Sequence, residues 1–391
     1  MTLRVFLKDS SEDRPQFVSN RFYRPELDVL RFFAFFGVFF FHTALYGPEF
    51  FAKHHLPNFL AVFESSLAKA GEYGVDLFFL LSAYLVTELL LREKVHRGTL
   101  DITAFYIRRI LRIWPLYFAF VALVALVPAL NPNHEFSLRY LVPFLLLGGN
   151  WSLAAFGFPG TSVVVPLWSV SVEEQFYLLW PPIVNKLARR HILFAAVVMI
   201  AVANVTRISA LLLHAHHPQV WCNTLARLDP MAFGIILAVV LRGRVPHFRS
   251  SLRLILLLFG LLDIVLVARY ADLDSRRFPL LWEPTLIGYP AVAIGCVLIL
   301  LAFLGSRSRL TESPALRYLG KISYGLYVFH ELAVLISDRI LTMFHNMFRG
   351  GLRFGLALAI TIFLAAISYR FLEAPFLDLK RKFTHVLSRP S

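Results

Sequence analysis

Apolar stretches as long as membrane-crossing helices are the feature that most constrains how this chain can fold. A bilayer core is about 30 Å thick, and a helix needs roughly 20 mostly apolar residues to cross it. Of the 391 residues, 58% are hydrophobic and only 16% are charged. This composition is too apolar for a soluble globule and indicates an all-α polytopic membrane protein. The apolar runs predict about ten transmembrane helices, at residues 27–46, 74–91, 113–130, 168–185, 192–213, 227–242, 252–270, 283–304, 322–341 and 352–372.

The distribution of basic residues predicts the orientation of these helices. A formal net charge of +14 could indicate nucleic-acid binding, but Lys and Arg lie in short clusters between apolar runs and form no basic domain. The positive-inside rule explains this pattern better and predicts that both termini are cytoplasmic. We therefore expect a cytoplasmic leader at 1–22, a membrane domain at 23–378 and a basic cytoplasmic tail at 379–391. The apolar segment near 138–150 is too short to span and predicts a re-entrant or interfacial piece.

The first apolar run carries ionisable residues, which are costly in lipid and therefore point to a functional site. Ten residues separate Arg31 from His42. In a helix these two residues lie roughly 16 Å apart along the axis and within about 20° of the same face. One stripe of this helix thus presents both a cation and an imidazole.

Asp76 opens the second predicted span and is expected at the same depth as His42. A carboxylate beside an imidazole fixes its tautomer and stabilises the imidazolium, as in activated nucleophile sites. Residue type alone is equally consistent with a carboxylate that caps its helix or lies at the membrane interface, without contacting His42.

A basic cluster, Arg108, Arg109 and Arg112, precedes the third predicted span on its cytoplasmic side. Arg108 and Arg112 share a helix face, and a pair of guanidinium groups can bind phosphate or pyrophosphate. Taken alone, the cluster is explained better by topology determination or by contact with anionic lipid headgroups.

The fourth predicted span carries two adjacent glutamates, Glu173 and Glu174, which point about 100° apart on a helix. We expect one to face an aqueous cavity and assign Glu173 to it. Trp168 and Tyr177 on this span suit stacking on a sugar or a position at the membrane interface. His330, near the middle of a later span, fits a buried structural histidine as well as an active-site one.

Together these segments resemble the acyltransferase-3 family of membrane O-acyltransferases, which acylate bacterial surface polysaccharides and antibiotics. PELDVLR followed ten residues later by His42 looks like the Arg-x10-His signature of the family, and GVDLFFLLSAYL, RRILRIWPLY, LWSVSVEEQFYLLWP and ISYGLYVFH are similar to its other motifs in order. The resemblance implies a multi-pass protein of the bacterial inner membrane that takes acyl-CoA, commonly acetyl-CoA, from the cytoplasm. It implies transfer to a hydroxyl, usually on a carbohydrate or glycoconjugate. It also implies that Arg31 and His42 are required for activity.

On this resemblance we expect His42 to act as general base, oriented by Asp76 or Glu173. Arg31 would stabilise charge on the acyl path. The remaining assignments are CoA phosphate binding by Arg108, Arg109 and Arg112, and acceptor binding by Trp168, Glu174, Tyr177 and His330. We expect no metal and no nucleic acid partner. Direct transfer and an acyl-histidine intermediate both stay open.

Two other functions remain compatible with the residues. A secondary transporter would explain ten spans with charges inside them. A glycosyltransferase using a lipid-linked sugar is the second alternative.

Overall fold

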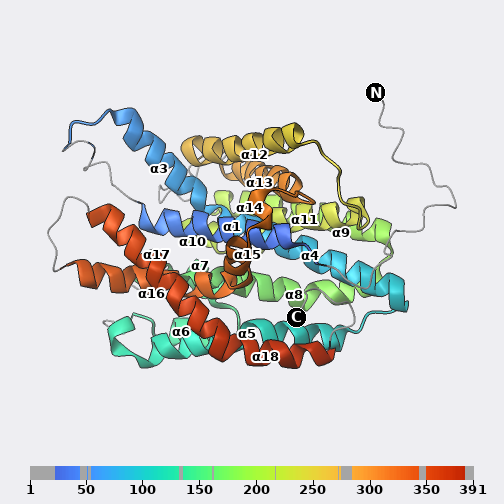
Figure 1. Ribbon diagram of the computed structural model, residues 1–391. Coiled ribbons are helices and arrows are strands. Elements are labelled where there is room, and N and C mark those ends of the chain that lie inside the picture. The colour runs from blue at the N-terminus through green and yellow to red at the C-terminus, as the bar shows by residue number, and fades with distance from the viewer. Residues whose placement is uncertain are drawn as a thin grey trace.

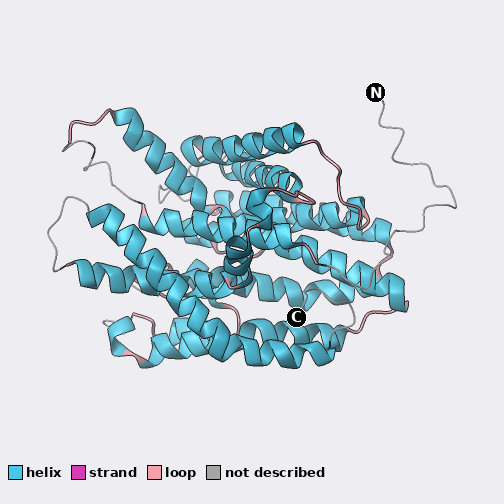
Figure 2. Cartoon of the chain, viewed as in Figure 1, coloured by secondary structure: helices cyan, strands magenta, loops and turns pink. Residues whose placement is uncertain are grey.

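The computed structural model describes residues 23–44, 51, 54–131, 135–160, 163–215, 217–271, 273, 284–342 and 349–383. These residues form helices and loops, and none of them lies in a β-strand (Figure 2). The predicted leader and residues 384–391 of the predicted tail lie outside the described residues. The α-helices are α1 (Pro25–Thr43), α3 (Asn58–Glu72), α4 (Gly74–Arg97), α5 (Ile102–Leu126), α6 (Leu138–Leu145), α7 (Gly149–Phe156), α8 (Trp168–Lys186), α9 (Arg189–Leu212), α10 (His217–Trp221), α11 (Asp229–Leu241), α12 (Ser250–Tyr270), α13 (Tyr289–Phe303), α14 (Arg309–Glu312), α15 (Pro314–Lys321), α16 (Ser323–Leu341), α17 (Arg349–Ser368) and α18 (Ala374–Lys380). Among the shorter elements, η4 (Val165–Leu167), η5 (Leu225–Arg227) and η7 (Tyr369–Glu373) matter below.

Judged by length and composition, fewer helices can cross a membrane than the sequence predicts. Six helical units in the described residues are long and apolar enough to cross a bilayer, and a seventh is added if the bent pair α15 and α16 counts as one span. Each of the ten predicted spans nevertheless overlaps an α-helix, from 27–46 on α1 to 352–372 on α17. The all-α membrane fold is confirmed, while the count of ten stays a prediction.

Two of the helices that are not apolar enough to count as spans, α1 and α8, carry charges that the sequence singled out. Three charged residues, Glu26, Asp28 and Arg31, lie in α1. The glutamates Glu173 and Glu174 lie in α8. A helix surrounded by other helices does not need a fully apolar surface, because its polar groups face protein instead of lipid.

Burial separates inner from peripheral helices. In the unit formed by α3 and α4, 72% of the most apolar window is buried inside the protein, against 22% in α9 and α12 and 17% in the unit that contains α17. Figure 1 shows α1 near the middle of the bundle, and α1 packs on α3, α4, α15 and α16. Of these inner helices, α1 carries Arg31 and His42 and α4 carries Asp76, whereas α5, with Arg108, Arg109 and Arg112, is 33% buried by the same measure.

The segment near 138–150 does not form a span-length helix. It contains α6, of eight residues, and the start of α7, also of eight residues, with a break at 146–148. The Tyr117 hydroxyl of α5 donates to the Phe144 carbonyl at 2.9 Å, which fixes α6 against α5. The segment is thus too short to span a membrane, as expected, and α6 buries only one face, since Leu138 and Leu146 are exposed. Its re-entrant or interfacial position stays a prediction.

Helix α1 approaches α3 so closely that only glycine fits at the contact. A Cβ atom placed on Gly71 of α3 would overlap the carbonyl group of Gly37 in α1. Both partners at this point are backbone atoms, which cannot move aside as a side chain can. Small residues at such crossings are the usual device by which membrane helices pack closely.

We expect Gly71→Leu to lower stability by about 1–3 kcal/mol, because the added side chain must push α3 away from α1. The matched control is Gly355→Leu in α17, where a Cβ would meet nothing within 4 Å. Thermal unfolding of the detergent-solubilised variants measures the difference. Equal unfolding temperatures for the two variants would contradict the close packing.

Candidate active site

His42 lies at the end of α1 and contacts a carboxylate from α16. Its Nδ1 atom is 2.5 Å from Oε1 of Glu331. His330 lies behind it, with the two imidazole rings 5.1 Å apart between centroids. His330 is fully buried, and its Nδ1 atom is 2.5 Å from the carbonyl oxygen of Tyr327.

These contacts assign the protons on both rings. A carbonyl oxygen only accepts, so Nδ1 of His330 carries the hydrogen and Nε2 is the lone-pair nitrogen. This Nε2 atom is buried and has no hydrogen-bonding partner among the described residues. The Glu331 carboxylate likewise holds the hydrogen on Nδ1 of His42, which leaves Nε2 of His42 able to take a proton.

His42, His330 and Glu331 are also the one group of such side chains in the described ranges that could hold a metal ion, with ligand atoms within 4.8 Å of one another. Two histidines and a carboxylate form a known zinc ligand set. The close His42–Glu331 contact fits a base that a carboxylate holds in orientation equally well. Our expectation of a metal-free site stays a prediction.

Three cavities follow one another through the bundle and share walls. The His42 cavity, of about 590 Å³, is lined by His42, Glu331, Trp168 and Tyr327 among others. A middle cavity of about 80 Å³ shares Val75 and Tyr327 with it. A third cavity, the arginine cavity, of about 100 Å³, shares Arg31, Arg109 and Arg112 with the middle one.

The arginine cluster differs in membership from the one expected. Arg109 and Arg112 line the middle and arginine cavities, and their partner there is Arg31 of α1. Arg108, which we paired with Arg112, instead donates to the Phe383 carbonyl at 2.6 Å and contacts Glu93 at 3.3 Å. Arg108 and Arg112 share a helix face, but the neighbouring carboxylate draws the Arg108 guanidinium away from the cavities.

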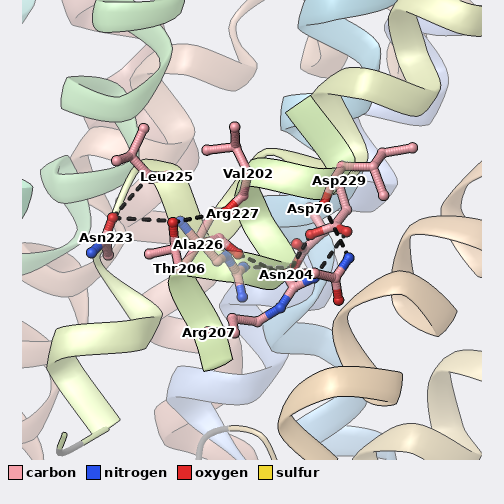
Figure 3. A network of polar contacts seen from close by, with 11 residues as sticks. Asp76, Val202, Asn204, Thr206, Arg207, Asn223, Leu225, Ala226, Arg227 and Asp229 are labelled. Carbon is pink, nitrogen blue, oxygen red and sulfur yellow. Dashed lines mark hydrogen bonds and ion pairs between the residues drawn. The ribbon is translucent and has the colours of Figure 1, made fainter. Parts of the chain in front are cut away.

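The pairing of Asp76 with His42 is wrong. Asp76 accepts a hydrogen bond from Arg227 of η5 at 2.8 Å, and both side chains are buried. A second buried pair joins Arg207 of α9 to Asp229 of α11, with N–O distances of 2.5 and 3.1 Å. Figure 3 shows the two arginines and two carboxylates converging. A buried aspartate needs a cation, and Arg227 supplies it better than a neutral imidazole would.

This network supports one wall of the His42 cavity. The Arg227 guanidinium lies 4.2 Å from the ring centroid of Trp221 and 5.9 Å from that of Trp168. Both tryptophans line the His42 cavity. Asp76 therefore acts on this cavity through Arg227 and the tryptophans.

The two glutamates of α8 lie in different surroundings. Glu173 lines the middle cavity, where it accepts from the Ser82 hydroxyl at 2.7 Å, and so it does not orient His42 as we expected. Tyr177 lines the same cavity. Glu174, expected to bind acceptor, instead accepts from the Trp114 indole at 2.8 Å and lines none of the three cavities. His330, for which acceptor binding was also expected, is fully buried and lines none of them either.

Sequence reasoning missed Glu331 as the partner of His42, and it missed the pairs of Arg227 and Arg207. Each is an ionisable residue within or beside an apolar run, and this was the available signal. This signal does not identify the partner of each residue, because each pair joins two different helices or a helix and a loop.

Fully buried ion pairs and partly exposed ion pairs predict different losses of stability on mutation. Asp229→Asn leaves Arg207 buried without a counter-charge and should cost about 3–5 kcal/mol of stability. Asp338→Asn breaks a pair with Arg353 in which the two side chains are 42% and 26% exposed, and should cost at most about 1 kcal/mol. Unfolding temperatures of the two purified variants test this. A smaller loss for Asp229→Asn than for Asp338→Asn would contradict the buried network.

Comparisons with known proteins point to one family. A family model described as an acyltransferase domain matches residues 24–370. The chain is 26% identical over 328 residues to peptidoglycan O-acetyltransferase OatA of Listeria monocytogenes, which covers 79% of this chain and 52% of that protein. It is 28% identical over 379 residues to the putative peptidoglycan O-acetyltransferase YrhL of Bacillus subtilis, covering 90% of this chain and 55% of that protein. No solved structure matches significantly.

The chain spans about half the length of these curated relatives. The family match, in contrast, extends from the start of α1 into η7 and includes every cavity-lining residue named above. On this match, the chain belongs to the acyltransferase-3 family, of which residues 24–370 are the acyltransferase domain.

Proposed function

We propose that the protein is a membrane-bound O-acyltransferase that moves an acyl group, such as acetyl, from acyl-CoA to a hydroxyl of a carbohydrate acceptor. The observation that carries the proposal is the series of three cavities with shared walls, which has cations at one end and the His42–Glu331 pair at the other. The relatives named as peptidoglycan O-acetyltransferases support a carbohydrate acceptor.

The arginine cavity supports the choice of donor. Its walls carry Arg31, Arg109 and Arg112, to which Arg24 and Lys380 add two further cations, against a single carboxylate from Asp28. CoA carries a pyrophosphate and a third phosphate, and guanidinium groups bind such oxygens with charge-assisted, often bidentate, hydrogen bonds. The CoA nucleotide would bind here, with its pantetheine arm extended into the middle cavity.

The His42 cavity supports the choice of chemistry. The acceptor hydroxyl donates to Nε2 of His42, which takes its proton as the oxygen attacks the thioester carbonyl carbon. Glu331 stabilises the imidazolium that forms. When the tetrahedral intermediate collapses, the carbon–sulfur bond breaks, and the CoA thiolate takes the proton back from His42. Thioester and hydroxyl have to meet within about 3–3.5 Å, beside the wall that Tyr327 and Val75 form between two cavities.

The first experiment measures CoA release from acetyl-CoA by the protein in nanodiscs. His42→Ala and Glu331→Gln should each lower the rate about 10²–10⁴-fold, because the first removes the base and the second its stabilising charge. The exposed His96 provides the matched control, and His96→Ala should act as wild type. Unchanged release by a folded His42→Ala would exclude His42 as the base.

Two further outcomes of this experiment separate the other functions. Removal of divalent metals with EDTA should leave the rate unchanged, and a loss of activity would make His42, His330 and Glu331 metal ligands instead. Uptake of a solute into vesicles with no binding of acetyl-CoA would favour a secondary transporter.

The regrouped arginines give a second prediction. Arg112→Ala should raise the KM for acetyl-CoA about 10–100-fold, since a hydrogen bond to a charged group contributes about 1.5–3 kcal/mol. Arg108→Ala, one turn away on α5, should leave this KM within a few-fold of wild type because Arg108 contacts Glu93 and Phe383. A larger rise in KM for Arg108→Ala than for Arg112→Ala would contradict this assignment and support the cluster expected from the sequence.

A further inference from the structure

Tyr327 of α16 lies at the boundary between the His42 cavity and the middle cavity. Of the described lining residues, Val75 and Tyr327 are common to both cavities, and Tyr327 is the one of these two with a polar side chain. The Tyr327 hydroxyl lies 3.0 Å from the carbonyl oxygen of Pro166 and 2.8 Å from the hydroxyl of Ser169. Pro166 lines the His42 cavity and Ser169 lines the middle cavity. The Tyr327 hydroxyl is therefore held where the two cavities adjoin.

The three oxygen atoms of this cluster share two hydroxyl hydrogens. The Ser169 hydroxyl lies 3.1 Å from the Pro166 carbonyl oxygen, so Ser169 can donate to the same acceptor as Tyr327. A hydroxyl carries one hydrogen and rotates to suit its surroundings, whereas a carbonyl oxygen only accepts. When Ser169 donates to Pro166, the hydrogen of Tyr327 is available to another acceptor. A ligand can therefore take one hydrogen bond from this cluster without leaving a buried carbonyl unsatisfied, which would be costly.

The helix period places Tyr327 one turn away from the contact between Glu331 and His42. Tyr327 and Glu331 are four residues apart on α16 and line the same cavity, as residues at this spacing on one helix face do. Four residues correspond to roughly 6 Å along the helix axis. The Tyr327 ring is buried and packs against the ring of Phe78, with centroids 5.9 Å apart and planes at 71°. A packed ring holds its hydroxyl at a fixed place, as a preorganised hydrogen-bond donor requires.

In the proposed reaction, negative charge develops on the thioester carbonyl oxygen at this boundary. The acceptor hydroxyl, bound by Nε2 of His42, attacks the carbonyl carbon from about 3–3.5 Å. The carbonyl oxygen then lies beyond that carbon, several ångströms from the base, and a donor one helical turn from the base suits this separation. In a low-dielectric interior, a fixed donor directed at the developing charge lowers the barrier to the reaction.

We propose that Tyr327 is a catalytic residue whose hydroxyl donates a hydrogen bond to the thioester carbonyl oxygen and to the oxyanion formed from it, with Ser169 as a positioning residue behind it. This inference rests on the proposed function for the presence of a thioester. No proton leaves Tyr327, because the acceptor proton passes to His42 and then to the CoA thiolate. The hydrogen bond is strongest while the oxygen carries negative charge, and it weakens when the carbon–sulfur bond breaks.

The kinetic test compares two tyrosines that each donate to a buried carbonyl oxygen. Tyr327→Phe removes the hydroxyl and keeps the ring that separates the cavities. It should lower kcat for CoA release from acetyl-CoA about 10²–10³-fold and leave KM within a few-fold of wild type, because the donor acts mainly in the transition state. The matched control is Tyr117→Phe, since Tyr117 donates to the Phe144 carbonyl at 2.9 Å and lines none of the three cavities. This control should keep the kcat of wild type, and both variants should unfold at similar temperatures.

A vibrational measurement detects the hydrogen bond without turnover. Full-length His42→Ala in nanodiscs binds acetyl-CoA labelled with ¹³C at the thioester carbonyl, and an isotope-edited infrared difference spectrum gives the stretching frequency of that carbonyl. A hydrogen bond to the oxygen lowers this frequency, so adding Tyr327→Phe should raise it, whereas adding Tyr117→Phe should leave it unchanged. Adding Ser169→Ala should raise it partly, because the Tyr327 hydroxyl is then left as the side-chain donor to the Pro166 carbonyl.

The outcomes separate this proposal from the proposed function. An unchanged kcat, or an unchanged carbonyl frequency, in a folded Tyr327→Phe would overturn the role of Tyr327. The proposed function would still stand in that case, provided that His42→Ala abolishes CoA release. Absence of acetyl-CoA binding by wild type and by His42→Ala would instead count against the proposed function, and the role of Tyr327 would be lost with it.

Discussion

Neutralisation of charge inside an apolar bundle is the constraint on which the rest of this structure depends. A bare carboxylate or guanidinium in a low-dielectric interior is too costly to keep, so each buried one needs a partner. Asp76 has Arg227, Asp229 has Arg207, and Arg92 has Glu88 at 2.7 Å. Since Asp76 and Arg227 are 151 residues apart in the chain, such pairs tie distant helices together at fixed points.

Pairing also decides which charged residues remain available for chemistry. The residues tied into fully buried pairs line none of the three cavities, whereas Glu331 is half-buried and holds His42 at the wall of the largest one. Arg108 illustrates the same division on a single helix, because its contact with Glu93 separates it from Arg109 and Arg112. Structural and site charges are thus distinguished by their partners and not by residue type.

The sequence predicts the helices well and the pairs poorly, for a physical reason. Apolar length places a span at 168–185 where α8 covers Trp168–Lys186, and one at 322–341 where α16 covers Ser323–Leu341. Helix formation and burial in lipid are local properties that a window of about 20 residues contains. The partner of Asp76 depends on which helix packs beside α4, and no local window contains that. Asp76 and His42 do lie at neighbouring helix ends, but the Asp76 carboxylate pairs with Arg227 instead of His42.

Glu331 shows the same limit at the shortest range. It follows His330 directly, and adjacent residues on a helix point about 100° apart. The two therefore reach His42 differently, His330 from behind the ring and Glu331 at Nδ1 from the cavity wall. Two helices, α1 and α16, thus supply His42 and its carboxylate, while α1 and α5 supply the arginines at the other end. Because α1 contributes to both ends, its ten-residue spacing from Arg31 to His42 fixes the separation between the cationic end and His42. In the proposed reaction, acyl-CoA spans this separation with its uncharged pantetheine arm.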